Sequence, residues 1–312
     1  MRTDAKMTVK PPALKPGDTV RIVTPASPLV PEKTQFMQNL LEQEGYRVEF
    51  SKHCFDADHY LAGPDAIRAS DLMQAFLDPK VAAVLCSRGG YGCARLFPHI
   101  DLDAILASRK MLLGFSDVTT LHIALNNRGL ATVHAPMALT LVAPREEFVY
   151  ESFRAVLRGE NPIPASAPRA ETAVSGIAAG KVVGGCMCLV CDTIGTPDEI
   201  DADGKILILE DVDENPHRVD AMLTHLLNAG IVQKAAGILV GEMTGTDGKS
   251  DEGIGGKPWK EIFRDRLAPL GIPMVWDFPF GHNKNMLSLP LGVEARLDAD
   301  AGTLEYLESH CA

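Results

Sequence analysis

The chain has 312 residues, of which 46% are hydrophobic and 23% are charged, the balance of an ordinary globular protein. At roughly 100–200 residues per domain, this length predicts two domains or one large one. The 30 Lys and Arg residues are outnumbered by 41 Asp and Glu, and the net charge of −11 argues against nucleic acid or an anionic membrane as the main partner.

Cysteine content and hydropathy favour a cytoplasmic protein. The seven cysteines are an odd number without framework spacing, which is typical of free thiols in a reducing compartment. The N-terminus shows no signal peptide, and no apolar run approaches the length of about 18 residues that a membrane span needs. We therefore expect a cytoplasmic chain with no membrane partner.

Predicted strands and helices alternate in the first half of the chain. Apolar and β-branched runs predict strands at 19–24, 46–50, 81–86 and 110–115. Helical periodicity predicts helices at 31–44, 65–77 and 117–127. This alternation indicates an α/β fold with a parallel sheet covered on both faces.

The composition changes near residue 160, where a stretch rich in Pro and Ala begins. We predict a loose tail at 1–17, an N-terminal α/β domain at 18–160, a linker at 161–175 and a β-rich C-terminal domain at 176–312. Within the last region we expect strands at 180–183, 206–209 and 237–240, a helix at 218–229, and antiparallel strands within 292–307.

A glycine-rich turn, Ser-Arg-Gly-Gly-Tyr-Gly at 87–92, follows the predicted strand at 81–86. Glycine lets the backbone approach a ligand and direct N–H groups at a phosphate or an oxyanion. The turn fits neither G-x-G-x-x-G nor G-x-x-x-x-G-K-[ST], so a nucleotide-dependent dehydrogenase ranks lowest among the functions considered. A tight turn that simply requires glycine is the alternative interpretation.

Ser116, in Gly-Phe-Ser-Asp at 114–117, lies between a predicted strand and a predicted helix. At such a turn the helix N-terminus offers N–H groups to a developing negative charge. Ser followed by Asp is also an ordinary helix N-cap, which is the favoured meaning when the pattern stands alone.

A carboxylate and an imidazole follow two further predicted strands. Glu210 and Asp211 end the apolar run at 206–209, and His282 follows Gly281 in a predicted loop. Taken alone, the two carboxylates fit a strand end that meets solvent, and the imidazole fits an exposed His. Together with Ser116 and the glycine turn, they make up the nucleophile, base, orienting acid and oxyanion hole that acyl transfer needs.

The order of these motifs resembles that of the LD-carboxypeptidases, serine peptidases that remove the terminal D-alanine from murein tetrapeptide. The resemblance extends from about Val20 to Gly292 and rests on Arg-Gly-Gly-Tyr-Gly at 88–92, Gly-Phe-Ser-Asp at 114–117, Ile-Leu-Glu-Asp at 208–211, Gly-His at 281–282 and Leu-Pro-Leu-Gly at 289–292. It implies a three-layer N-terminal domain with a parallel sheet, a smaller β-rich α+β C-terminal domain, and a site between them in a metal-free, cytoplasmic homodimer.

The resemblance also implies roles for single residues. Ser116 matches the family nucleophile, His282 the base and Glu210 the acid, with Glu214 and Asp211 as rival acids.

The remaining implied roles concern binding. The backbone N–H groups of Asp117 and Gly90, or alternatively Gly89, would form the oxyanion hole. Arg88 or Lys284 would recognise the terminal carboxylate of a small peptide substrate.

Three cysteines lie close together at Cys186, Cys188 and Cys191, where small or apolar residues are expected. No fourth thiol or His is near in the sequence and the segment is apolar, so we interpret them as buried free thiols and expect no metal and no cofactor. The acidic loop at 244–257 lacks the EF-hand spacing and is interpreted as a solvated, mobile loop, with a lid as a further role.

The leading hypothesis is a serine-type LD-carboxypeptidase that acts on murein tetrapeptide through an acyl-enzyme, in peptidoglycan recycling. The first alternative is a self-immunity hydrolase that cleaves peptidyl- or aminoacyl-nucleotide antibiotics. It would need an aromatic side chain against the nucleobase, for which Trp259 and Trp276 are the available tryptophans. The second alternative is a non-catalytic ligand-binding module, against which the complete set of Ser, Glu and His argues.

Overall fold

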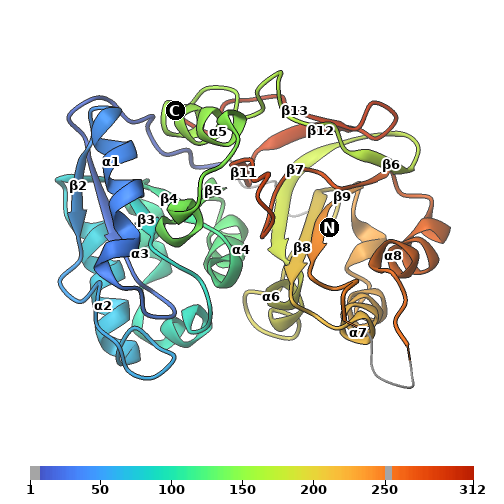
Figure 1. Cartoon of the computed structure of the whole chain (residues 1–312), viewed down its shortest axis with the longest axis horizontal. Helices are drawn as coiled ribbons and strands as arrows, with labels where there is room; N and C mark the ends of the chain where they lie inside the picture. Colours follow the sequence, from blue (N-terminus) through green and yellow to red (C-terminus); the bar gives the residue numbers. More distant parts are fainter. Residues whose placement is uncertain (1–7, 250–254) are drawn as a thin grey trace.

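The computed structural model describes residues 8–249 and 255–312, which form two sheets with helices packed around them (Figure 1). The strands are β1 Thr19–Val23, β2 Arg47–Phe50, β3 Val81–Cys86, β4 Met111–Gly114, β5 Thr132–His134, β6 Glu171–Val174, β7 Ile177–Cys186, β8 Ile206–Val212, β9 Gly237–Thr244, β10 Met274–Trp276, β11 Leu289–Leu291, β12 Glu294–Asp298 and β13 Thr303–Tyr306. The α-helices are α1 Gln35–Gln43, α2 Asp65–Leu77, α3 Leu102–Ser108, α4 Thr119–Asn127, α5 Glu147–Leu157, α6 Met187–Asp192, α7 Pro216–Asn228 and α8 Trp259–Leu267.

The first sheet has the strand order β11-β5-β4-β3-β1-β2, in which β1 to β5 run parallel. Alternate residues of β3 point to opposite faces: Leu85 packs with α1 and α5, whereas Val84 packs with α2, α3 and α4. Helices on both faces explain why β3 is an unbroken apolar run, and the expected three-layer α/β arrangement is confirmed.

The strand order of the first sheet reverses between β1 and β3, which are neighbours. In open α/β sheets, ligands bind outside the carboxyl ends of the strands at such a reversal. The glycine turn at 87–92 follows β3, and its Gly89 carbonyl accepts the N–H of Ser27 from the loop after β1 (3.2 Å). The turn therefore lies at the position where this topology favours a ligand.

The second sheet has the order β13-β12-β7-β8-β9-β10-β6, with β7 to β10 parallel and the remaining strands antiparallel. In β8, Leu207 and Leu209 pack with side chains of α7 and α8, and Ile206 and Ile208 face the opposite side. Ile208 lies in the same hydrophobic cluster as Leu113 of the first sheet. The two sheets therefore share a continuous core.

Helix α4 lies between the two sheets in Figure 1. Its first residue, Thr119, accepts the N–H of Cys186 on its hydroxyl (3.1 Å), at the carboxyl end of β7. A Cβ on Gly185 would lie 2.6 Å from this hydroxyl oxygen, so the strand can approach the helix only with glycine there. This contact brings the carboxyl ends of β7 and β8 toward those of β3 and β4.

The prediction of a loose tail is wrong for residues 8–17. Val9 bridges to Leu130, and the buried Leu14 donates its N–H to the carbonyl of Leu157 (2.8 Å). Apolar side chains in a segment rich in Pro and Lys hold it against the domain. Residues 1–7 of that predicted tail, and residues 250–254 of the predicted mobile loop, lie outside the described residues.

The predicted linker at 161–175 contains strand β6, which pairs antiparallel with β10 at the edge of the second sheet. Its residues are exposed or half-buried, so the strand lacks the apolar run by which a buried strand is recognised. No helix in the part of the chain that the structure describes is long and apolar enough to cross a membrane.

The end of the chain returns to the N-terminal half, although the sequence assigned all residues after 176 to the other domain. Strand β11 pairs antiparallel with β5 and covers an edge that would otherwise be open. His310 contacts the Val156 carbonyl through Nε2 (2.8 Å), and Figure 1 shows the C-terminus beside α5. A short apolar strand carries no local signal of which sheet it will join.

Candidate active site

Ser116 lies in a sharp turn after β4. The strand ends at Gly114, and Ser116 begins a 3₁₀ turn, Ser116–Val118, that continues into α4. The φ angle of Ser116 is 62°, in the left-handed region, which costs a non-glycine residue about 1–3 kcal/mol. Strain of this kind concentrates at functional sites, where the surrounding structure enforces it.

Three side chains from distant parts of the sequence form a hydrogen-bonded series. His282 Nε2 lies 3.0 Å from Ser116 Oγ, and His282 Nδ1 lies 2.7 Å from Glu210 Oε2. The same carboxylate oxygen accepts the backbone N–H of His282 (3.1 Å). Glu210 is fully buried, whereas the His282 side chain is 17% exposed, so the imidazole faces solvent and the carboxylate does not.

The structure brings one of the three candidate acids to His282. Asp211, next to Glu210, accepts the backbone N–H of Cys188 (2.8 Å). Glu214 lies 3.8 Å from the Nε atom of Arg218. Glu210 therefore holds the position that orients the imidazole.

Two opposing effects set the pKa of His282. Burial of the imidazole lowers its pKa, but the charge and hydrogen bond of Glu210 outweigh burial, and the pKa lies above the ordinary value. The ring of Phe115 packs on the imidazole with centroids 4.8 Å apart. His282 is therefore held as a base stronger than an ordinary histidine.

Two glycines make room for the series of hydrogen bonds. A Cβ on Gly281 would lie 2.5 Å from Glu210 Oε2, and the φ of Gly281 is +93°. A Cβ on Gly89 would lie 2.8 Å from Ser116 Cβ and 2.9 Å from Ser116 Oγ. At both positions any side chain would push against the carboxylate or the hydroxyl.

The two backbone segments predicted to form an oxyanion hole meet beside Ser116. The Cβ position of Gly89 is 3.2 Å from the amide nitrogen of Asp117. The buried Asp117 carboxylate accepts the N–H of Cys93 (2.8 Å), which ties the serine turn to the end of the glycine turn. Burial raises the pKa of Asp117, and the hydrogen bond from Cys93 opposes that rise. Gly90, with φ +107°, follows in the same turn.

Ser116 and His282 line a cavity of about 440 Å³ that carries charges of both signs. Its positive residues are Arg88 and Arg145, and its acidic residues are Asp211 and Glu214. Among the described residues, those lining the cavity do not include the predicted Lys284, which is exposed.

Arg145 is a cavity residue that the sequence did not indicate. It belongs to no motif and lies between β5 and α5, where its guanidinium donates to the Thr140 carbonyl (2.6 Å). Only the folded chain brings it to the same cavity as Arg88. Arg88 itself donates to the Pro28 carbonyl (2.9 Å).

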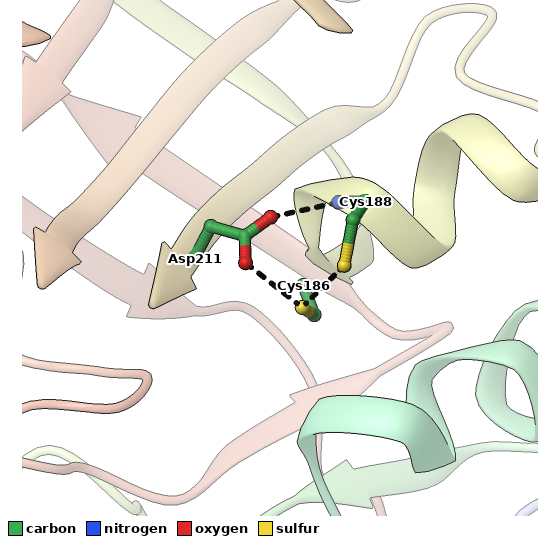
Figure 2. A group of neighbouring side chains, drawn as sticks. All are labelled: Cys186, Cys188 and Asp211. Atoms are coloured by element: carbon green, nitrogen blue, oxygen red, sulfur yellow. Dashed lines mark hydrogen bonds between the residues drawn. The ribbon is translucent and has the colours of Figure 1, made fainter. Parts of the chain in front are cut away.

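The cysteine cluster is divided by the fold. Cys186 and Cys188 have their sulfur atoms 3.4 Å apart, and Cys186 Sγ lies 3.6 Å from Asp211 Oδ1 (Figure 2). Cys191 instead contacts the carbonyl of Met222 through its thiol (3.6 Å). All seven cysteines are free thiols, but Cys188 is half-buried and lines the cavity, so the expectation of a buried thiol is wrong at this position.

The chain belongs to the LD-carboxypeptidase family, as the motifs predicted. Residues 20–135 match the N-terminal domain of the LD-carboxypeptidases, and residues 179–297 match their C-terminal domain. The protein is therefore a serine-type carboxypeptidase, a hydrolase.

Two relatives are similar over nearly their whole length. A probable murein peptide carboxypeptidase of Bacillus subtilis is 35% identical over 301 residues, which cover 93% of this chain and 91% of the relative. The murein tetrapeptide carboxypeptidase of Pseudomonas aeruginosa is 30% identical over 295 residues, which cover 90% of this chain and 93% of the relative.

Two solved structures illustrate the fold that this chain shares with known proteins. The muramoyltetrapeptide carboxypeptidase of Oxalobacter formigenes has a TM-score of 0.79 and 26% identity, with 92% of this chain and 97% of that chain covered. The microcin C7 self-immunity protein MccF has a TM-score of 0.85 and 22% identity, with 97% and 99% covered. At that identity, the likeness to MccF shows the fold alone.

Proposed function

We propose that the protein is an LD-carboxypeptidase that hydrolyses the amide between the L-centre of a diamino acid and the terminal D-alanine of murein tetrapeptide. The observation that carries this proposal is the series Ser116–His282–Glu210 at the cavity, with contacts of 3.0 and 2.7 Å. The substrate class is supported by the names of the relatives from Bacillus subtilis and Pseudomonas aeruginosa.

In the proposed acylation step, Ser116 Oγ attacks the carbonyl carbon while His282 Nε2 takes the hydroxyl proton. Serine is a weak nucleophile at neutral pH and needs such a base. Glu210 accepts a hydrogen bond from the Nδ1–H group without taking its proton, which fixes the tautomer and stabilises the imidazolium that forms. His282 then gives its Nε2 proton to the leaving amine, and D-alanine departs.

Deacylation reverses these roles with water as the nucleophile. His282 takes a proton from water as its oxygen attacks the ester carbon on Ser116, and the returning proton restores the serine hydroxyl. The backbone N–H groups of Asp117 and of Gly90 or Gly89 are proposed to bind the oxyanion in both steps. Each such donor contributes typically about 3 kcal/mol to transition-state stabilisation.

Recognition of the terminal carboxylate is assigned to Arg88. The side chain lines the cavity beside Ser116, and planar guanidinium groups bind carboxylates through paired hydrogen bonds. Lys284 is the weaker candidate because it is exposed and does not belong to the described lining of the cavity. Asp211 and Glu214, also in the lining, offer a negative partner for an ammonium group of the diamino acid.

The alternative is hydrolysis of an aminoacyl- or peptidyl-nucleotide antibiotic, which the shared fold of the self-immunity protein MccF keeps open. The two tryptophans weigh against it. Trp259 and Trp276 are buried, pack on each other with ring centroids 6.4 Å apart, and belong to the core beneath the second sheet. Neither belongs to the described lining of the cavity, so neither is positioned to stack on a nucleobase.

A competition between the two substrate classes tests this choice. The purified protein is incubated in parallel with murein tetrapeptide and with an aminoacyl sulfamoyl adenosine, and products are followed by mass spectrometry. We expect release of D-alanine and little cleavage of the nucleotide analogue. Turnover of the analogue with an intact tetrapeptide would overturn the substrate assignment while leaving the hydrolase mechanism in place.

We further propose a cytoplasmic homodimer that acts in peptidoglycan recycling. Seven free thiols support a reducing compartment. The dimer follows from the family resemblance, and light scattering of the purified chain at several concentrations would test it. A mass of one chain at every concentration would contradict the dimer.

A further inference from the structure

A cluster of three metal-ligating side chains lies outside the proposed catalytic series. Cys186 is the last residue of β7, Cys188 lies in the first turn of α6, and Asp211 lies near the end of β8. Because β7 and β8 are parallel neighbours, their carboxyl ends meet at one edge of the sheet, where Cys186 lies opposite Glu210. Figure 2 shows the two thiols and the carboxylate directed toward one another.

We infer that Cys186, Cys188 and Asp211 form a binding site for a thiophilic divalent cation of the Zn²⁺ type in the wall of the active-site cavity. The ligand atoms of all three residues lie within 4.8 Å of one another. All three residues also line the cavity that contains Ser116 and His282.

The separations fit the edges of a coordination tetrahedron. With Zn–S near 2.3 Å and Zn–O near 2.1 Å, tetrahedral angles place two sulfur atoms about 3.8 Å apart and sulfur and oxygen about 3.6 Å apart. The observed separations are 3.4 Å between the sulfurs and 3.6 Å between Cys186 Sγ and Asp211 Oδ1. The ligand atoms of Cys188 and Asp211 lie within 4.8 Å of each other, so modest side-chain adjustments would let the cluster surround an ion.

The donor set selects the kind of ion. Two thiolates and one carboxylate suit Zn²⁺ or Cd²⁺, whereas Mg²⁺ and Ca²⁺ prefer oxygen ligands alone. Three protein ligands leave the fourth tetrahedral position for water or another ligand. Cys188 is half-buried on the cavity wall, which provides the ion with a route to the site.

The charges around the cluster also favour a cation. Asp211 is 2% exposed and is adjacent to the fully buried Glu210. The Asp211 carboxylate accepts the backbone N–H groups of Cys188 (2.8 Å) and Val212 (2.9 Å). A bound cation would place a positive charge beside these two buried carboxylates, and binding would release the thiol protons.

The sequence does not indicate this site, because no fourth thiol or His lies near the three cysteines in the chain. The third ligand is instead Asp211, which lies 25 residues from Cys186 in the chain. Cys191 points away toward Met222. This divergence supplies a matched control, since Cys191 lies in the same helix as Cys188 but outside the cluster.

The test is Zn²⁺ binding by the full, tag-free chain, stripped of metal and kept reduced with a phosphine. Competition with a chromophoric chelator should show one Zn²⁺ per chain in the wild type and in Cys191→Ser. Second-sphere losses alone weaken metal sites by about 10–100-fold, so loss of a direct ligand in Cys188→Ser should weaken binding by at least tenfold. Circular dichroism confirms that each variant is folded.

Cd²⁺ provides a second readout, because thiolate-to-cadmium charge transfer absorbs in the ultraviolet. The wild type and Cys191→Ser should show the band of two thiolates, and Cys188→Ser about half of it. Equal Zn²⁺ affinity and equal Cd²⁺ absorbance in wild type and Cys188→Ser would overturn the site, as would wild type that binds no Zn²⁺ under these conditions.

An ion bound at this wall of the cavity should also inhibit hydrolysis of murein tetrapeptide. This inhibition rests on the proposed function, whereas the binding of Zn²⁺ is independent of it. Zn²⁺ should inhibit the wild type and Cys191→Ser at concentrations that leave Cys188→Ser active. Inhibition that persists unchanged in Cys188→Ser would overturn this consequence and point to His282 as the metal's target.

Discussion

The Nε2 atom of His282 lies 3.0 Å from the Oγ atom of Ser116, although 166 residues separate them in the chain. Ser116 follows a strand of the first sheet, and Glu210, which contacts His282, lies near the end of a strand of the second. The site therefore exists only because the two sheets share a core that includes Leu113 and Ile208. Catalysis in this account depends on the docking of the sheets as much as on the three side chains.

Removal of the Ser116 hydroxyl should abolish hydrolysis without unfolding the chain. Loss of the nucleophile in a serine hydrolase lowers kcat on the order of 10⁴–10⁶-fold. Ser116→Ala should therefore release no detectable D-alanine while its thermal transition stays close to that of the wild type. Comparable rates for the two proteins would show that Ser116 is not the nucleophile.

The left-handed backbone conformation of Ser116 should lower the stability of the folded chain. At φ 62°, alanine keeps the left-handed strain that glycine relieves. After allowing for the greater freedom of glycine in the unfolded chain, Ser116→Gly should be about 0.5–1 kcal/mol more stable than Ser116→Ala. Urea titration of the two inactive variants measures this difference. A Gly variant less stable than the Ala variant would contradict the strain.

The pH dependence of kcat/KM should follow His282, which must be neutral to accept the serine proton. Its pKa is raised by Glu210 beyond the lowering that burial causes, so activity should be lost as the pH falls through a value above about 6.5. In Glu210→Gln the imidazole of His282 stays buried, but the carboxylate charge that raises its pKa is removed. The acidic limb should move to lower pH, and the plateau should fall on the order of 10⁴-fold.

A control for this profile is Asp211→Asn, because the pKa of Asp211 is about 6 and it lines the same cavity. This variant should keep an acidic limb, moved to lower pH by less than in Glu210→Gln, because the charge of Asp211 raises the pKa of His282 less than Glu210 does. An acidic limb that stays in place in Glu210→Gln, or disappears in Asp211→Asn, would remove His282 as the titrating base.

Gly89→Ala should impair catalysis sterically. The new methyl group would lie 2.8 Å from Ser116 Cβ and 2.9 Å from its Oγ. Displacement of the reacting atom by about 1 Å can lower the rate on the order of 10²-fold. Gly248→Ala is the matched control, since nothing lies within 4 Å of a Cβ at that position. Equal kcat values for the two variants would show that the glycine turn does not constrain Ser116.

Arg88→Ala should raise KM for the tetrapeptide about tenfold or more, the effect of losing a charged hydrogen bond worth about 1.5–3 kcal/mol. Lys284→Ala should change KM less, because Lys284 is exposed and outside the described lining of the cavity. Steady-state kinetics on the tetrapeptide and on its C-terminal amide separate carboxylate binding from general damage. An unchanged KM in Arg88→Ala would eliminate Arg88 from substrate recognition.

The sequence predicted the elements whose own residues carry the signal. The helix at 65–77 and the strand at 81–86 have the predicted bounds, because an amphipathic face and an apolar run are local properties. Strand β6 lies within the predicted linker, since its exposed and half-buried residues resemble a loop and only pairing with β10 makes it a strand.

In the candidate site, too, the residues with a local sequence signal were predicted and those that depend on the fold were not. Ser116, Glu210 and His282 were named from the order of motifs, and the structure brings their side chains together. Arg145 and the contact of Asp211 with Cys186 were not predicted, because no pattern within one segment can report which strand ends become neighbours. The catalytic roles of the three named residues stay predictions that kinetics must test.

The most direct test is mass spectrometry of the purified chain incubated with L-Ala-γ-D-Glu-meso-diaminopimelyl-D-Ala, with Ser116→Ala as the control. We expect that the wild type removes one alanine from the peptide and that Ser116→Ala leaves it intact. An intact tetrapeptide with folded wild-type protein, or cleavage by both proteins, would contradict it.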